Sequence, residues 1–172
     1  MTYIIVDRGG PRDKQSIQLA TRLGNWIRNE QRHERSPASL RAAEEIWRKA
    51  LPSAELRSST ATYNCVGMVF ACRRTWVAPE ELELILGDDG HRRVVDRNAV
   101  KAGDVVVYKD SDNKPLHIAV VLEARADVRM ASTELTVLSK WGADGEYLHR
   151  ELDVPPDYGT TTEYWTERKE IP

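Results

Sequence analysis

The sequence predicts an α+β domain in which helices come first and an antiparallel β meander follows. Up to about residue 100, apolar residues recur mostly at helical spacing. Beyond that point they alternate with a period of two and are often β-branched, as in half-buried strands. Helices followed by a run of strands are typical of helices packed on one face of an antiparallel sheet. With 172 residues, the chain is long enough for one domain with its own core, so we expect a single domain.

The first third is predicted to hold a short strand and two helices. Residues 3–6 form an apolar strand, and residues 13–31 carry an apolar stripe at helical spacing. Ser36 is the N-cap of the second helix, Pro37 takes its first position, and Pro52 ends it. The stripe of the first helix consists of Ile17, Ala20, Leu23, Trp26 and Ile27.

A polar connector over residues 58–64 leads into a central helix over 65–76, which is apolar and therefore expected to be buried. A short helix over 79–86 follows and is closed by Gly87. Cys65 lies at the first turn of the central helix. Cys72 lies about two turns deeper, on the same helix face.

The rest of the chain reads as strands joined by turns. The pattern predicts strands over 105–108, 118–122, 134–140, 146–152 and 161–166, with a turn over 109–115 between the first two.

Composition limits the partners. The chain is 41% hydrophobic and 30% charged with a net charge of −2, so no global field draws it to nucleic acid or to an anionic membrane. No apolar run approaches the ~20 residues that span a bilayer, and the N-terminus lacks the basic region of a secretory signal. We therefore expect no nucleic-acid or membrane partner and a cytoplasmic location as encoded, with export by a non-classical route left open. Composition says nothing about the oligomeric state.

The two cysteines predict neither a disulfide nor a metal site. Seven residues apart on a helix, Cys65 and Cys72 have Cα atoms about 10 Å apart, too far for a disulfide. Two cysteines with scattered histidines also match no zinc-ligand spacing. No oxidising compartment and no metal are implied.

Cys65 is the candidate nucleophile, because a polar stretch leads into it and a helix begins there. Unpaired N–H groups and the helix dipole at such a position are expected to lower the pKa of a thiol. The alternative is an inert core cysteine, a role that suits Cys72 better. His117 opens an apolar strand and is the best candidate base of the four histidines, although a strand-end histidine without a role is the alternative. A helix-start cysteine followed by a strand-start histidine is the arrangement of papain-like thiol hydrolases.

Three segments resemble the NlpC/P60 superfamily of papain-like cysteine peptidases. Tyr-Asn-Cys-Val-Gly-Met-Val over 63–69 is similar to the family's Asp-Cys-Ser-Gly-Leu-Val segment. Ala-Gly-Asp-Val-Val-Val-Tyr over 102–108 resembles its Pro-Gly-Asp-Leu-Val-Phe-Phe strand entry, and Leu-His-Ile-Ala-Val-Val-Leu over 116–122 resembles its His-Val-Gly-Ile-Tyr strand. The segments come in the family's order. Asn64 and Val66 replace the polar residues that help peptidoglycan-cleaving members bind the substrate's amine.

The resemblance implies a papain-like NlpC/P60-type fold, with N-terminal helices packed on an antiparallel β meander. It divides the domain into an N-terminal strand and helices over 1–57 and a catalytic core over 58–172. It implies Cys65 as nucleophile and His117 as base.

The remaining site residues are less fixed by the pattern. The family takes its orienting residue from the strand after the histidine strand, where Ser139 offers a hydroxyl, and His149 in the next segment is a further candidate. Trp141 either lines the substrate groove or belongs to the core. The oxyanion hole is expected to combine the Cys65 N–H with a donor from Tyr63 or Asn64, unless Asn64 is simply the helix N-cap.

The predicted function is hydrolysis of an amide bond through a Cys-His thiolate and an acyl-enzyme, with no metal and no organic cofactor. The expected partner is a peptide or amide substrate, peptidoglycan-derived fragments included. An acyltransferase would use the same acyl-enzyme with an amine in place of water. A binding module that keeps the fold with an inert Cys65 is the alternative from another class.

Overall fold

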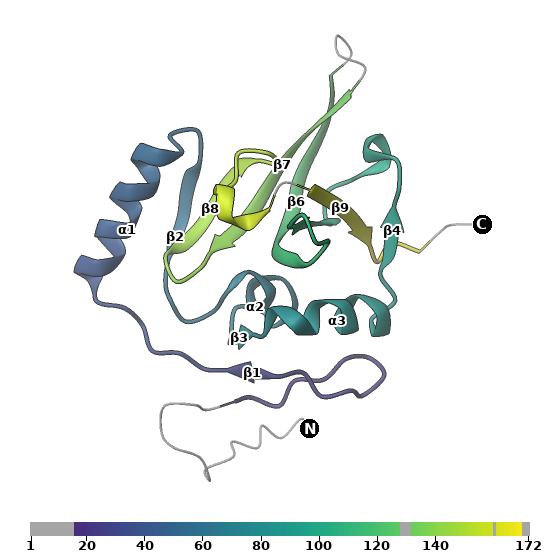
Figure 1. The fold of residues 1–172 in the computed structure, drawn as a ribbon, viewed down its shortest axis with the longest axis horizontal. Coiled ribbons are helices and arrows are strands. Elements are labelled where there is room, and N and C mark those ends of the chain that lie inside the picture. The colour runs from purple at the N-terminus through teal and green to yellow at the C-terminus, as the bar shows by residue number, and fades with distance from the viewer. Residues whose placement is uncertain (1–15, 128–131, 160, 170–172) are drawn as a thin grey trace.

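The computed structural model describes residues 16–127, 132–159 and 161–169. Within them the chain forms three short helices, a seven-stranded antiparallel sheet and a small two-stranded sheet (Figure 1). The predicted α+β class is confirmed. None of the helices in these residues is long and apolar enough to cross a membrane.

The helices are α1 (Pro37–Ala50), α2 (Cys65–Phe70) and α3 (Leu82–Asp88), and the 3-10 turns are η1 (Pro79–Glu81), η2 (Arg97–Ala99) and η3 (Pro156–Tyr158). The strands are β1 (Asn29–Glu30), β2 (Glu55–Ser59), β3 (Trp76–Val77), β4 (Arg92–Val94), β5 (Val105–Lys109), β6 (Pro115–Asp127), β7 (Ser132–Trp141), β8 (Gly145–Arg150) and β9 (Thr161–Thr166).

The large sheet has the strand order β2-β8-β7-β6-β5-β9-β4. Consecutive strands β5 to β8 pair as the predicted meander. Two strands of this sheet were not predicted: β4, and β2, which overlaps the first two residues of the predicted polar connector and pairs with β8. The last strand, β9, lies between β5 and β4 instead of extending the meander.

The predicted helix over 13–31 is wrong for the described part of that range. Residues 16–31 are extended or turned, and Leu23 and Trp26 are 72% and 54% exposed. A turn reverses the chain here, because the Thr21 N–H donates to the Asn25 carbonyl and Gly24 adopts a φ of +86°. The apolar stripe is a coincidence of spacing. The predicted strand over 3–6 lies outside the described residues.

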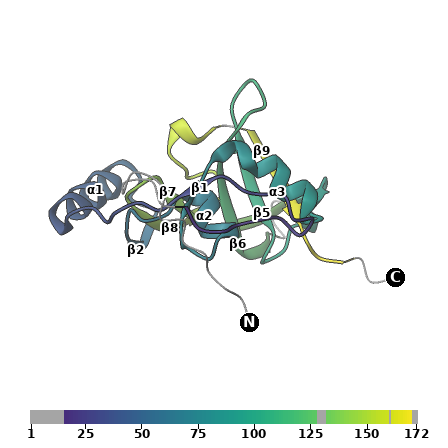
Figure 2. The ribbon, with the colours of Figure 1, turned by 90° about the horizontal axis from the view of Figure 1, so that it is seen from below.

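The second predicted helix is confirmed as α1. Ser36 caps it by accepting the Ser39 N–H, and Pro37 takes the first helical position. Trp47 anchors α1 to the sheet, since its indole packs edge-on against Trp141 at 5.1 Å between ring centroids and donates to Asp144 at 2.8 Å. Figures 1 and 2 place α1 at the β2 edge of the molecule, away from α3.

The central helix is shorter than predicted and does not bury Cys72. α2 ends at Phe70, where the Gly67 carbonyl accepts from both Ala71 and Arg73. Cys72 and Arg73 then take positive φ values of 50° and 63°, which turn the chain out of the helix. Cys72 is exposed, so its predicted role as an inert, buried cysteine is wrong.

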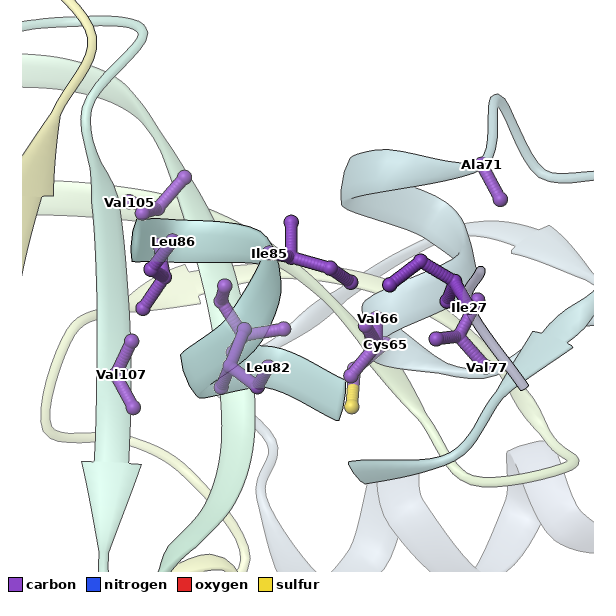
Figure 3. Close-up of a cluster of buried hydrophobic side chains, with 11 residues drawn as sticks. Ile27, Cys65, Val66, Ala71, Val77, Leu82, Ile85, Leu86, Val105 and Val107 are labelled. Atoms are coloured by element: carbon purple, nitrogen blue, oxygen red, sulfur yellow. The ribbon is translucent and has the colours of Figure 1, made fainter. Parts of the chain in front are cut away.

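The large sheet has a core cluster on each face. Alternate residues of β5 and β6 belong to the two clusters. Val107 and Ile118 face α2 and α3, whereas Tyr108 and Ala119 face the other way. Figure 3 shows the first cluster, with Cys65 beside Val66 and near the α3 residues Leu82 and Ile85. The first cluster consists of Ile27, Cys65, Val66, Ala71, Val77, Leu82, Ile85, Leu86, Val105, Val107 and Ile118.

Candidate functional site

Cys65 is the first residue of α2, as predicted, and α2 packs on β6 and β7. The cysteine is only 8% exposed. Asn64 is the N-cap of the helix, because its side-chain oxygen accepts the Gly67 N–H at 2.9 Å. The polar segment that ends at Asn64 and the apolar helix after it therefore place the Cys65 thiol at a helix start, within the first core cluster.

Burial changes the pKa of the Cys65 thiol more than its position at the helix start does. Desolvation raises the pKa of Cys65, against the N–H groups of Ile118, Val66 and Cys65 itself and the charge of Lys140, which favour the thiolate. The helix start alone predicts a lowered pKa. That prediction is wrong for this closed structure, because the loss of hydration outweighs the helix-start N–H groups.

His117 lies on β6 opposite Tyr108 and is 2% exposed. Its ring stacks on Tyr158 with 4.2 Å between centroids and an interplanar angle of 11°, and Tyr108 packs at 5.5 Å. Its Nε2 is buried and has no hydrogen-bond partner among the residues that the structure describes. Burial, with a smaller effect from nearby His149, lowers the pKa of His117 to about 3, so the imidazole is neutral at neutral pH.

Cys65 packs against β6 at Ile118, the residue after His117, whereas the His117 ring lies on the opposite face of the sheet. The Ile118 N–H favours the thiolate form of Cys65, and Ile118 packs in the same cluster as Cys65. The His117 ring packs with Tyr108 and Tyr158 instead. Within the described residues, no hydrogen bond joins Cys65 to His117.

Ser139, Trp141 and His149 form a buried chain of hydrogen bonds on the His117 side of the sheet. Trp141 donates to Ser139 Oγ at 2.8 Å, and Ser139 Oγ lies 2.8 Å from His149 Nε2. His149 Nδ1 lies 2.7 Å from the Arg150 carbonyl, so it carries the proton and Nε2 accepts from Ser139. Ser139 thus contacts His149 rather than His117, and fully buried Trp141 is a core residue.

Tyr63 and Asn64, the two predicted oxyanion donors, are engaged elsewhere. The Tyr63 hydroxyl donates to Glu146 at 2.7 Å. The Asn64 amide donates to the Val77 carbonyl at 2.7 Å, and its oxygen also accepts the Val77 N–H at 3.1 Å. These side chains tie the start of α2 to β8 and β3.

Lys140 is the residue near this site to which the sequence motifs assign no role. Its side chain is fully buried, its ammonium donates to the Gly142 carbonyl at 2.7 Å, and it lies 5.4 Å from the centre of the Tyr63 ring. The signal in the sequence is its spacing, because Lys140 shares a strand face with Leu138, where a strand pattern calls for an apolar residue. Tyr158, which covers His117, carries no comparable signal.

A cavity of about 560 Å³ opens beside Asn64. Arg28 and Arg32 line this cavity, and the Arg32 guanidinium lies 3.7 Å from the centre of the Trp76 ring. Cys65 is not among its lining residues. The described residues contain no group of three or more His, Cys, Asp or Glu side chains that could hold a metal ion.

Residues 55–166 match a family model described as a domain of unknown function, DUF7689. The match covers more than half of the chain, which therefore belongs to this family. No curated protein and no solved structure matches the chain.

Proposed function

We propose that this member of the DUF7689 family is a cysteine hydrolase of papain-like type that cleaves an amide bond through an acyl-enzyme on Cys65. One observation carries the proposal most: the helix-start thiol of Cys65 lies at the backbone N–H of Ile118, and the preceding residue is a buried histidine whose Nε2 has no hydrogen-bond partner in the described part of the chain. An unpaired buried ring nitrogen is costly in a folded protein unless it serves a purpose.

In the proposed reaction, His117 Nε2 takes the thiol proton and the Cys65 sulfur bonds to the substrate carbonyl carbon. Backbone N–H groups at the start of α2 hold the developing oxyanion. The carbon–nitrogen bond then breaks, and the His117 imidazolium gives its proton to the leaving amine. Water attacks the acyl-enzyme, releases the acid and restores the thiol. At neutral pH the His117 imidazole is neutral and can accept a proton, but its pKa of about 3 makes it a weak base in this closed structure. The reaction therefore requires water to enter the site and raise that pKa.

The cavity beside Asn64 is the proposed place for the substrate chain, because it lies next to the start of α2. The site must open for chemistry, since Cys65 and His117 are almost fully covered in this structure. Tyr158, stacked on His117 from η3, has to move, and the His117 ring has to turn toward Cys65, because it lies on the opposite face of β6 from Ile118 and Cys65.

A binding module is the second candidate, and the buried thiol favours it. With an exposure of 8% and a pKa raised by burial, Cys65 has the surroundings of an inert core cysteine. In that case the cavity beside Asn64 would hold a ligand without any covalent step.

Purified protein incubated with fluorogenic peptide amides and with peptidoglycan fragments tests the proposal. We expect release of the amine and, on rapid quenching, an acyl adduct on Cys65 seen by peptide mass spectrometry. Cys65→Ala should abolish both signals, and His117→Gln should lower turnover at least about a hundredfold, as expected for loss of a general base.

Cys72→Ala is the matched control. Because Cys72 is exposed, its substitution should leave turnover unchanged. Binding of a substrate without turnover, equally in the parent and in Cys65→Ala, would favour the binding module and sink the hydrolase.

A further inference from the structure

Lys140 is a lysine buried where a sheet normally buries an apolar residue. Its relative exposure is 0%. Burying an ammonium is costly unless a counter-charge or several acceptors compensate for the lost water. One carbonyl, that of Gly142, accepts from it, while an ammonium has three protons to donate.

The carboxylates around Lys140 are bonded to other groups. Glu146 lies opposite Lys140 in the β7–β8 pairing but accepts from Tyr63 and forms an ion pair with Arg73 at 2.5 Å. Asp144 pairs with Arg35 and accepts from Trp47. Among the described residues, no carboxylate lies within ion-pair distance of the Lys140 ammonium, and the titratable side chains that act on it are Asp144, Glu146, Cys65 and Glu34.

Lys140 and Cys65 lie on the same face of the sheet. Ala119 pairs with Ser139, so the next position outward sets Ile118 against Lys140, and Ile118 packs with Cys65. The ring of Tyr63, two residues before Cys65, lies 5.4 Å from the ammonium. The register and this ring contact both point the ammonium toward the start of α2.

His117, the other side chain that could carry a positive charge near the thiol, is uncharged at neutral pH. Burial keeps His117 neutral, with a pKa of about 3, so it cannot be the standing partner of a thiolate. Burial also lowers the pKa of Lys140, to about 8, yet leaves most of it protonated at neutral pH. Lys140 is therefore the positive charge available to the sulfur.

We propose that Lys140 is the positioning residue of this site, and that its buried ammonium is the counter-charge that favours the thiolate of Cys65 against the opposing effect of burial. The inference rests on the proposed function, because it assigns what activates the proposed nucleophile. The lysine stays protonated throughout, and the thiol proton leaves to His117 Nε2 or to water. Lys140 acts through Cys65 and need not touch the substrate.

The test is the rate of iodoacetamide alkylation of Cys65 against pH, measured by intact mass in a Cys72→Ala background. We expect Lys140→Met to raise the pH midpoint of alkylation by about one unit or more, as for loss of a nearby positive charge. Lys140→Arg, which keeps a cation, should restore the midpoint to within about half a unit of the parent.

Lys109→Met is the matched control. Lys109 is also a buried lysine of this sheet, but it pairs with Glu163 at 2.9 Å on β9. Its substitution should leave the midpoint of Cys65 unchanged. Equal midpoints in Lys140→Met and Lys109→Met would overturn the inference. If Lys140→Met does not fold, the reciprocal measurement decides: by NMR, Cys65→Ser should lower the pH at which Lys140 loses its proton, and no change there overturns it.

The two proposals fail separately. A shifted midpoint without amide cleavage would refute the hydrolase and keep the Lys140–Cys65 coupling. Amide cleavage with a midpoint indifferent to Lys140 would keep the hydrolase and refute the coupling.

Discussion

His117 sets the pH response of this fold at the scale of a single residue. A buried histidine that stays neutral must remain unprotonated for the chain to remain folded. Its pKa falls from an ordinary value of 6.5 to about 3, so the unfolded chain binds a proton more readily than the folded one between those values. Stability from this residue is fully present above pH 6.5 and is lost as the pH falls toward 3.

We expect this effect to lower the free energy of unfolding by about 2 kcal/mol between pH 7 and pH 5. Urea unfolding at both pH values measures it, with His117→Gln as the variant that removes the titration. The parent should lose more stability than His117→Gln by about that amount. His33→Gln is the control, because His33 is exposed. An equal pH response in the parent and His117→Gln would contradict the prediction.

At this scale the sequence predicts where a residue lies in a helix or strand better than it predicts which side chain the residue contacts. A polar run ending in Asn64 predicts the helix cap that the structure has. The apolar run after His117 predicts that this residue begins a strand, whereas β6 begins two residues earlier and His117 is buried within it. The pairing of Ser139 with His149 depends on the register of β7 and β8, which no local pattern fixes. The alternation along β7 puts Lys140 on the same face as Leu138, but whether that face is buried depends on what packs over the sheet, which the local sequence does not show.

At the scale of elements, α2 is held against the β3 segment by a glycine. A Cβ on Gly67 would lie 1.9 Å from the carbonyl oxygen of Thr75, a backbone atom that cannot rotate away. Thr75 is fully buried, and its hydroxyl donates to the Glu30 carbonyl at 2.8 Å. Close approach of two backbones is the reason that this position requires glycine.

Gly67→Ala is therefore expected to lower the free energy of unfolding by about 1–3 kcal/mol, the usual cost of overpacking. It should also reduce turnover, because it displaces the helix that carries Cys65. Gly87→Ala in α3 is the matched control, since a Cβ there meets nothing within 4 Å. That variant should be neutral or gain a few tenths of a kcal/mol in helix propensity. Thermal unfolding of both variants compares them, and equal melting temperatures would refute the close approach.

Elements with local signals are predicted well, and those without are not. α1 has a cap, a proline at its first position and a stop. The false helix over 13–31 has an apolar stripe but none of these end signals, and Gly24 inside it marks the turn that the chain makes. β2 is alternately half-buried and exposed at the sheet edge, so its sequence reads as a polar connector.

At the scale of the whole molecule, β9 joins parts of the sheet that are distant in sequence. It pairs with β5 on one side and β4 on the other. Buried Glu151 accepts from Tyr164 of β9 and pairs with Arg97 at 2.6 Å. Arg168, just after β9, pairs with buried Asp104 at 2.5 Å.

A chain truncated after residue 159 is therefore expected to lose cooperative unfolding, because β4 loses its partner strand and β5 gains an open edge. Circular dichroism melting and size-exclusion chromatography should show a broad transition and aggregates. Truncation after residue 169, which keeps β9 and Arg168, should melt like the full chain. A cooperative transition at the parent temperature in the shorter chain would contradict this account.

The sequence predicts the meander because neighbouring strands pair through short turns. It does not predict where β9 inserts, because pairing distant in sequence leaves no local signal.

The place of β9 also matters while the chain is being made. Lys109 ends β5 and Thr161 begins β9, about fifty residues later, or several seconds at ordinary rates of synthesis. During that interval one edge of the nascent β5 is unpaired, and β4 lacks the strand with which it pairs. A sheet completed by so distant a strand forms late and slowly. We therefore expect the growing polypeptide, more than the finished protein, to depend on chaperones.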